Sequence, residues 1–379
     1  MNLKSLLLCS DEKIVRVLRR TLGDLDIGVE HCTSAEEALR RLTRERFEAI
    51  IVDCAGPGAA DVLRAARTAP CNKRAVAVAI LDPDIGLRSA FEIGAHFILY
   101  KPVSVERAKS SFRAARALMK RERRRNFRVA VRFPVEMSSV DSDAHFKVHT
   151  TDVGEGGLAI SLPRRSKLRG SWQLMFTLPG SEKRLDVAAE FAWEGTGTQA
   201  GLRFQDPSTE VVRTLREWLG RNSPEGEKDD PPVRCQLTDL SLGGCYLDLP
   251  SPFPVSTRVT LSMRAPGVEL RSEGVVRIMH PDKGMGVEFT QTTPEHRALL
   301  EKFLNRLTEN PEALPELLVE PEGLETEIGQ HSQTAAGSSE SEDPLLDLFR
   351  SHAALGADTF LTELRKQRGV FVAAASASS

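Results

Sequence analysis

Two stretches of the chain, TDVGEGGLAISLP (151–163) and TDLSLGGCYLDLP (238–250), are copies of one another. A second matching pair, GLRFQDPSTEVVRTLREWL (201–219) and GVEFTQTTPEHRALLEKFL (286–304), follows them. The copies are 85 to 87 residues apart, so one unit of short strands with Gly and Pro turns, closed by a helix, is used twice. Short strands in such a unit predict a small β-barrel, and the repeat predicts two barrels in tandem.

Residues 1–120 have a different texture, in which short apolar runs alternate with helical patterns in five βα units. Runs such as AIIVDC (49–54) are wholly apolar, as expected of parallel strands that are covered on both faces. This part is therefore predicted to be an α/β doubly wound parallel sheet, which places ligands at the carboxyl ends of its strands. Asp11, Asp53 and Lys101 fall at those ends.

Composition excludes several classes of protein. The 379 residues are 41% hydrophobic and 27% charged with a formal net charge of −2, which is typical of two or three globular domains. We see no apolar run of the length a membrane span needs and no secretory signal, so a cytoplasmic location is expected. The six cysteines lack the spacing of a zinc site or of a disulfide framework.

The C-terminal part changes texture again. From Leu307 to Phe349 there are eleven acidic residues and no Lys or Arg, which predicts a disordered acidic linker over 308–343. Residues 344–368 then carry apolar side chains at helical spacing, as in an amphipathic helix. Such a helix docks either on a partner protein or on this same chain, and the sequence leaves both open.

The first 120 residues resemble the response-regulator receiver family. The strings DCAGP (53–57) and FILYKP (97–102) stand where that family has its phosphoacceptor and its lysine. The resemblance implies Asp53 as the phosphoacceptor, a pocket of Asp11, Glu12 and Lys101, and Mg²⁺ held by Asp11, Glu12 and Asp53. Carboxylates that hold Mg²⁺ beside an attacking Asp suit phosphoryl transfer.

This receiver is degenerate by the family's pattern. Ser10 replaces the first acidic residue, Ile98 replaces the aromatic switch residue, and AVAVAILDPD (75–84) lacks the hydroxyl of strand four. Each change removes one part of the phosphorylation relay and weakens the expected Mg²⁺ site. Two interpretations stay open, a phosphorylated receiver and a receiver fold kept for binding or dimerisation.

The repeated unit resembles the PilZ family, whose small β-barrels bind the bacterial messenger cyclic di-GMP. RRNFRV (124–129) resembles the family's RxxxR motif, and DVGEGG (152–157) resembles its [DN]-x-S-x-x-G motif. Arginine suits phosphates and guanine edges, and aspartate accepts hydrogen bonds from guanine N1 and N2. The resemblance implies a ligand site in the first copy at Arg124, Arg125, Arg128, Asp152, Gly154 and Gly157.

The motif of the first copy is imperfect and its register is not unique. Gly154 stands where the family has Ser, which removes a hydrogen-bonding group and weakens binding by about 1 kcal/mol. The pairs Arg121/Arg125 and Arg128/Arg132 have the same spacing as Arg124/Arg128. Seven basic residues over 120–132 are also typical of a solvated linker or a nonspecific phosphate patch. The strand pair that follows favours the dinucleotide site.

The second copy shows the reverse pattern. Asp239, Ser241 and Gly244 complete the second motif, but no RxxxR precedes them and the joint at 223–233 is acidic. We therefore expect a truncated barrel in which Asp239 and Ser241 make a turn and pin a strand edge. The alternative is a composite site in which Arg124 and Arg128 face Asp239 and Ser241.

Together these patterns predict a bacterial signalling protein that binds cyclic di-GMP and relays it to a partner, and that is not an enzyme. The alternatives are a phosphorylation-controlled regulator using Asp53 and a ligand-free protein scaffold. A protein partner at 344–368 and a homodimer are compatible with this interpretation, while nucleic acid is disfavoured by the absence of a recognisable binding motif. The expected domains are a receiver-like domain at 1–120, PilZ-like domains at 121–222 and 223–307, the linker at 308–343 and the helix at 344–368.

Overall fold

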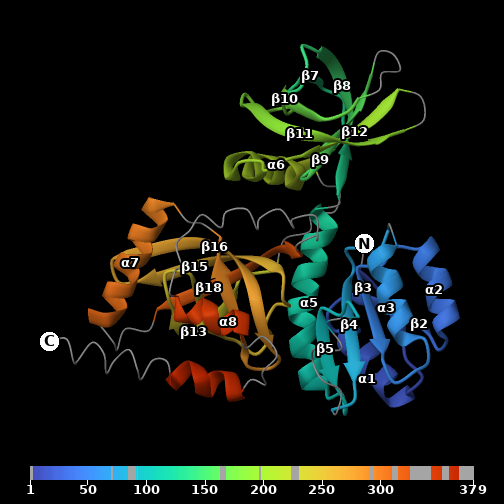
Figure 1. Ribbon diagram of the computed structural model, residues 1–379. Helices are drawn as coiled ribbons and strands as arrows, with labels where there is room; N and C mark the ends of the chain where they lie inside the picture. The colour runs from blue at the N-terminus through green and yellow to red at the C-terminus, as the bar shows by residue number, and fades with distance from the viewer. Residues whose placement is uncertain are drawn as a thin grey trace. The chain divides into compact units, whose positions relative to one another are not determined.

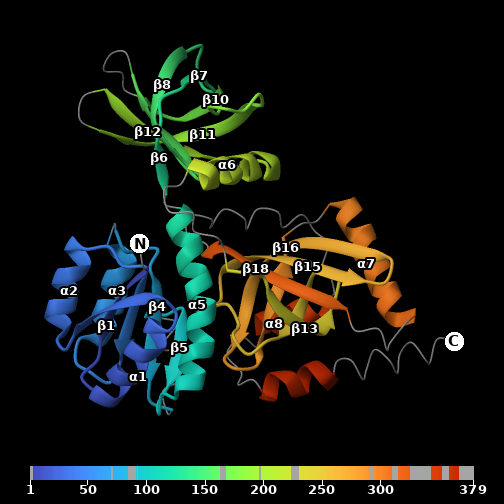
Figure 2. The same cartoon turned by 180° about the vertical axis from the view of Figure 1, so that it is seen from behind.

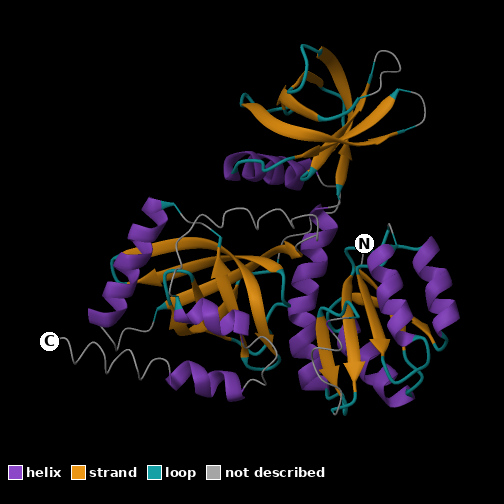
Figure 3. Ribbon diagram, viewed as in Figure 1, coloured by secondary structure: helices purple, strands orange, loops and turns teal. Residues whose placement is uncertain are grey.

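The computed structural model describes residues 3–69, 71–83, 91, 93–125, 127–162, 168–195, 198–222, 230–290, 293–309, 315–324, 343–351 and 358–366. The chain divides into two compact units, one over 123–228 and one that combines 2–122 with 229–379 (Figures 1, 2 and 3).

The N-terminal domain is a parallel sheet with helices on both faces. Its strands are β1 (Leu3–Leu8), β2 (Ile27–Cys32), β3 (Ala49–Asp53), β4 (Val76–Leu81) and β5 (Phe97–Tyr100), in the order β2-β1-β3-β4-β5. Apolar side chains on one face pack against α1 (Glu12–Gly23) and α5 (Val105–Arg125), and those on the other against α2 (Ala35–Arg44) and α3 (Ala59–Thr68). This flavodoxin-like order confirms the predicted doubly wound domain. The helical pattern near 86–94 lies mostly outside the described residues.

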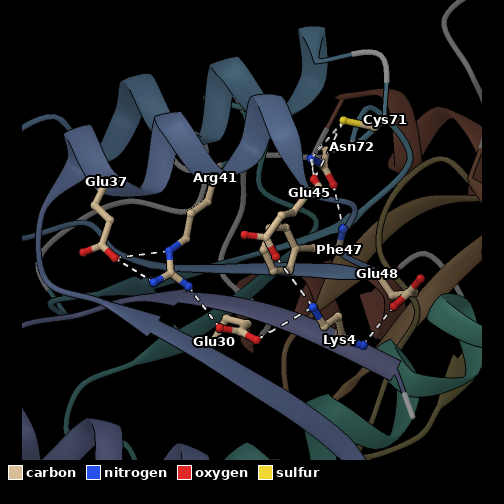
Figure 4. A network of polar contacts seen from close by, with 9 residues as sticks. All are labelled: Lys4, Glu30, Glu37, Arg41, Glu45, Phe47, Glu48, Cys71 and Asn72. Carbon is tan, nitrogen blue, oxygen red and sulfur yellow. Dashed lines mark hydrogen bonds and ion pairs between the residues drawn. The ribbon is translucent and has the colours of Figure 1, made fainter. Parts of the chain in front are cut away.

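A polar network holds the amino ends of this sheet together (Figure 4). Asn72 is fully buried, and its side-chain amide donates to the carbonyls of Leu42 and Glu45 at 2.7 and 2.8 Å, while its carbonyl accepts from Phe47 N at 2.8 Å. One side chain thereby satisfies the end of α2 and the approach to β3. The network stabilises the fold at the edge opposite to the carboxyl ends where the receiver motifs lie.

The first barrel is a closed ring of six strands with one short strand added. The ring contains β7 (Pro134–Ser139), β8 (His145–Gly154), β9 (Gly157–Ser161), β10 (Ser171–Thr177), β11 (Arg184–Glu194) and β12 (Gln199–Phe204). The short strand β6 (Arg128–Ala130) pairs with β8 outside the ring, and α6 (Thr209–Asn222) packs on the barrel core.

The second barrel is also a closed ring, and it is not truncated. Its strands are β13 (Val233–Leu240), β14 (Gly244–Asp248), β15 (Thr257–Ala265), β16 (Val268–His280), β17 (Gly284–Phe289) and β18 (Glu316–Leu324), with α7 (Pro294–Glu309) before β18. The expectation of a disordered linker was therefore wrong for Glu316–Leu324. Residues 310–314 and 325–342 of that linker, and 223–229 of the joint, lie outside the described residues.

Strand β18 takes the ring position that β7 has in the first barrel. Val135 of β7 pairs with Val148, and Leu317 of β18 pairs with Cys235, which is 87 residues beyond Val148. Both strands run antiparallel to their partners and both inward residues are buried. The second copy is thus a permuted barrel, in which the first strand comes from the end of the chain segment.

Helix α5 joins the α/β domain to the second barrel within one unit. Arg121, whose side chain is 7% exposed, contacts Glu322 of β18 through an ion pair of 3.0 Å between Nη2 and Oε2. Glu122 accepts from Leu324 N at 2.7 Å, and Lys120 pairs with Asp230 at 2.8 Å. The first part of the basic run therefore stabilises this packing, which excludes Arg121 from an RxxxR site.

The C-terminal helix packs on the chain's own second barrel. The apolar side chains of α8 (Pro344–Ser351) and of the helical residues 358–366 form one cluster with Tyr246 and Ile278. Of the two hypotheses for this helix, the structure shows docking on the same chain. None of the helices in the described part of the chain is both long and apolar enough to cross a membrane.

The Arg121–Glu322 pair supports a stability prediction. Replacement Glu322→Ala leaves a buried guanidinium without this carboxylate and should lower the unfolding free energy of this unit by about 3 kcal/mol. Urea denaturation followed by circular dichroism measures the change. The urea midpoint followed by tryptophan fluorescence should not shift, because all three tryptophans (Trp172, Trp193, Trp218) lie in the unit of the first barrel.

The matched control is Glu269→Ala, which breaks the exposed Arg264–Glu269 pair and should cost less than about 1 kcal/mol. Equal losses in the two variants would contradict a buried anchor between α5 and β18.

Candidate functional site

One outer row of residues crosses the first barrel from β11 to β6. Register pairs Trp193 with Gly201, Gly201 with Ala159, Ala159 with Asp152, and Asp152 with Ala130. Neighbouring strands are about 4.8 Å apart, so the row brings together residues that are up to 71 positions apart in sequence. We call these five positions the outer rung of the first barrel.

Two β-bulges turn the functional side chains of the rung outward. In β8 the register shifts between Thr150 and Asp152, so that Thr150 points into the barrel and Asp152 points out. In β11 it shifts between Phe191 and Trp193, so that Phe191 packs on the core and Trp193 is exposed. Without the extra residue, strict alternation would have turned both Asp152 and Trp193 inward.

Trp193 lies flat across the rung because its neighbour has no side chain. A Cβ at Gly201 would lie 2.1 Å from the indole Nε1, so only glycine lets the ring lie over that strand. The indole is nevertheless 42% exposed. Two strand spacings, about 10 Å, separate Gly201 from Asp152 along the rung. The rung therefore carries an exposed aromatic ring and a carboxylate about two strand spacings apart.

Arg128 lies directly on the rung's carboxylate. Its Nη1 is 2.7 Å from Asp152 Oδ1, and the two side chains are 42% and 28% exposed. Pairing of β6 with β8 places Arg128 opposite Gly154. A half-exposed ion pair of this kind is weak, so the guanidinium can exchange its partner for an anionic ligand at little cost.

Gly154, at the position where the family has Ser, lies under strand β6, which carries Arg128. A Cβ there would lie 2.9 Å from Phe127 O and 3.1 Å from Arg128 Cγ. The glycine therefore lets β6 lie directly on β8. Gly157 is likewise required by packing, because its Cβ would be 2.2 Å from Leu202 O of β12. Between them, Glu155 is held by Arg216 of α6 at 2.9 Å.

The remaining arginines of the motif lie at the end of α5. Arg124 and Arg125 occupy its last turn, four and three residues before β6 begins. Arg121 is buried in its pair with Glu322, which leaves the alternative register Arg121/Arg125 without its first arginine, and the Arg124/Arg128 register stays a prediction. The sequence analysis did not identify Trp193. The only signal for this residue is that its partner in the neighbouring strand β12 is a glycine, Gly201.

In the second copy the motif residues form a turn. Ser241 Oγ accepts from Gly243 N and Gly244 N at 3.3 and 3.1 Å, and Asp239 Oδ1 accepts from Leu240 N at 2.8 Å. This is the turn expected from the sequence. The composite site of Arg124 and Arg128 with Asp239 and Ser241 stays a prediction.

In the α/β domain the expected phosphoacceptor is held by a lysine and a thiol. Asp53 Oδ1 is 2.8 Å from Lys101 Nζ and also accepts from Ala55 N at 3.2 Å, while Oδ2 accepts from Cys9 Sγ at 3.5 Å. Burial, together with the Asp53 charge, raises the pKa of the Cys9 thiol to about 11. Burial lowers the pKa of Lys101, but its hydrogen bond to Asp53 and the charge of that carboxylate outweigh this effect and raise it.

Two carboxylates of the expected Mg²⁺ site have protein partners in this structure. Asp11 Oδ1 caps α1 by accepting from Lys13 N and Ile14 N, and Glu12 begins that helix. Among the described residues, no three His, Cys, Asp or Glu side chains are grouped to hold a metal ion. In this structure Asp11 serves as a helix cap and Asp53 as the partner of Lys101, and the Mg²⁺ site of Asp11, Glu12 and Asp53 stays a prediction.

Comparison with known proteins places two matches on the barrels. Residues 122–221 and 222–306 each match the model of the PilZ domain family. No match was found among curated proteins. Since β18 lies beyond residue 306, the second match lacks the strand that closes the second barrel.

Solved structures resemble separate parts of the chain. A PilZ domain of CeSA from a cellulose-synthesizing bacterium is 19% identical, covers 26% of this chain and 100% of its own, and has a TM-score of 0.22. The chemotaxis response regulator CheY4 of Vibrio cholerae is 22% identical over 30% of this chain and 99% of its own, with a TM-score of 0.29. The receiver domain of the Francisella response regulator 1452 is 21% identical over 32% and 99%, with a TM-score of 0.28.

The contacts of Asp53 predict that the α/β domain resists phosphorylation. Incubation of the full chain with a small phosphodonor and Mg²⁺ should leave its intact mass unchanged, as in Asp53→Ala, because Asp53 is paired with Lys101 and Ser10 supplies no carboxylate for Mg²⁺. Ser10→Asp, which supplies the missing carboxylate, is the comparison in which labelling should increase. A phosphoryl adduct on the wild type that Asp53→Ala abolishes would contradict this prediction.

Proposed function

Since the chain carries two tandem PilZ domains behind a domain with the receiver fold, we propose that it is a bacterial signalling protein that binds cyclic di-GMP at its first PilZ domain. The observation that supports this best is the outer rung, where Arg128, Asp152 and Trp193 lie on one exposed face. The proposal includes a cytoplasmic location and no catalytic activity.

Each side chain of the proposed site, on the rung or beside it, matches one group of the dinucleotide. Guanidinium groups make forked hydrogen bonds to phosphate oxygens or to the guanine O6 and N7 edge, which is the proposed role of Arg124 and Arg128. The Asp152 carboxylate accepts from the guanine N1 and N2 donors. The exposed indole of Trp193 offers a face on which a guanine base stacks.

The basic residues from Arg124 to Arg128, which we call the basic arm, link this site to the rest of the chain. The arm continues α5 directly, and α5 is anchored at Arg121 and Glu122 on β18 of the second barrel. A ligand that draws Arg124 toward Arg128 and Asp152 of the first barrel would therefore act on the end of an anchored helix. In this proposal, the differential contact between the free and bound arm is what relays the signal.

We expect Arg128→Ala to weaken cyclic di-GMP binding to the full chain by about 30- to 100-fold, because it removes charge-assisted hydrogen bonds worth roughly 2 to 3 kcal/mol. Calorimetric titration measures the affinity. The matched control is Arg184→Ala in the same barrel, whose arginine also forms an exposed 2.7 Å pair, with Glu136.

Arg184→Ala should change the affinity by less than twofold. Equal losses in both variants would indicate nonspecific charge attraction, and the absence of saturable binding to the wild type would overturn the proposed function. Asp239→Ala tests the composite site in the same titration, since a large loss there would mean that the second copy contributes to binding.

Trp193 gives a separate prediction with an optical readout. Trp193→Ala should weaken binding about tenfold through lost base stacking, and Trp193→Phe should retain most of the affinity. Cyclic di-GMP should quench the tryptophan fluorescence of the wild type, because Trp172 and Trp218 are buried and Trp193 is exposed. Equal quenching in Trp193→Phe would show that the base does not stack on this ring.

A further inference from the structure

The second barrel has the same outer rung as the first, built on the same two bulges. Asp239 pairs with Tyr246, Tyr246 with Gly286, and Gly286 with Ile278. The register shifts between Leu237 and Asp239 and again beside Ile278, as it does beside Asp152 and Trp193. The face that carries the nucleotide site in the first copy is therefore also formed in the second.

In the second copy, apolar groups cover this face. Tyr246 stands where the first copy has Ala159, and Ile278 stands where it has Trp193. Both residues are 1–2% exposed, although their side chains lie outside the barrel core. What buries them is the described part of the chain's own C-terminal segment, residues 343–351 and 358–366.

Helix α8 sits on the glycines of the rung and of the motif turn. A Cβ at Gly243 would lie 2.5 Å from Leu346 Cδ1, and a Cβ at Gly286 would lie 2.6 Å from the Phe349 ring. Asp343 caps α8 by accepting from Leu345 N at 3.1 Å, and its other oxygen accepts from Gly243 N at 2.9 Å. A carboxylate of the segment thus binds the backbone of the [DN]-x-S-x-x-G turn itself.

The helical residues 358–366 complete the cover. The Phe360 ring lies 5.2 Å from that of Tyr246 and 4.8 Å from that of His280, and it stacks on Phe349 at 6.3 Å. Tyr246 OH and His280 Nδ1 are hydrogen bonded at 2.9 Å beneath it. Phe360 and Leu364 are 0% and 2% exposed, so the apolar side chains of residues 358–366 are buried in the cluster, as those of α8 are.

We propose that the second PilZ domain is a helix-binding module whose ligand is the chain's own segment 343–366. Apolar side chains from two short helices provide the buried contact, and the Asp343 carboxylate on Gly243 N fixes its position on the motif turn. The segment occupies the face that the first copy leaves open, so this domain recognises a peptide there. The inference does not depend on nucleotide binding by the first copy.

The experiment uses a labelled synthetic peptide of residues 343–366 and the full chain carrying Leu346→Asp and Phe349→Asp. These substitutions should release the chain's own segment, after which the peptide should bind saturably, as measured by fluorescence anisotropy. The wild type should bind the peptide at least about tenfold more weakly, since its tethered segment competes at an effective concentration on the order of millimolar.

Two controls locate the peptide on the proposed face. Leu299→Asp alters an exposed leucine of α7, which is 44% exposed, and should behave as the wild type. Adding Gly243→Leu to the released chain should abolish peptide binding, because the new side chain takes the place of Leu346. Equal peptide binding to the wild type and the released chain, or none to a folded released chain, would overturn the proposal.

Hydrogen exchange keeps the test decisive if the released chain folds poorly. In the wild type, backbone amides of 345–349 should exchange slowly, and in the single variant Gly243→Leu they should exchange at least about tenfold faster. Fast exchange of these amides in the wild type would equally overturn the proposal.

Discussion

Closure of the second barrel is the constraint on which much of this molecule depends. A β-sheet without a closing strand leaves rows of unpaired backbone groups at β13 and β15. In the described part of the chain, no strand lies between α6 and β13 to close the ring. Strand β18, which follows α7, closes it by pairing with β13 and β15. Because β18 ends beside α5, the same strand that closes the ring also supplies Glu322 and the Leu324 amide to the α/β domain.

The two barrels show how one scaffold can carry two different outer faces. Both have a bulge before the motif aspartate and another in the long strand opposite, so both present the same outer rung. In the first copy, an exposed indole and an exchangeable Arg–Asp pair occupy it. In the second, tyrosine and isoleucine make the face apolar, and a buried apolar face requires a cover. The difference lies in a few outward side chains, while the inward residues keep the same barrel.

Much of this arrangement could be predicted from the sequence, for identifiable reasons. The parallel domain follows from apolar runs such as Ile50–Val52, and the tandem barrels follow from the repeated Asp-x-x-x-x-Gly strings. Trp193 could not be placed, because a bulge inverts the inward and outward alternation and leaves no mark in the pattern of apolar residues. β18 was hidden by its acidic surroundings, since Glu316, Glu320 and Glu322 alternate with the inward Leu317 and Val319. A count of acidic residues over the segment does not reveal this alternation of outward and inward side chains.

The basic run at 120–132 contains residues with two different roles, so it cannot be interpreted as a single motif. Its seven cations look uniform in the sequence, but Lys120 and Arg121 pair with acids that flank the second barrel, whereas Arg128 pairs with the motif aspartate of the first. The dividing point lies between Glu122 on α5 and Arg128 on β6. Buried pairs are strongly destabilising to break, while exposed pairs exchange readily. Helix α5 and strand β6 therefore combine a structural anchor and a candidate ligand-binding arginine within eight residues, from Arg121 to Arg128, and a change at either end can be expected to affect a different domain.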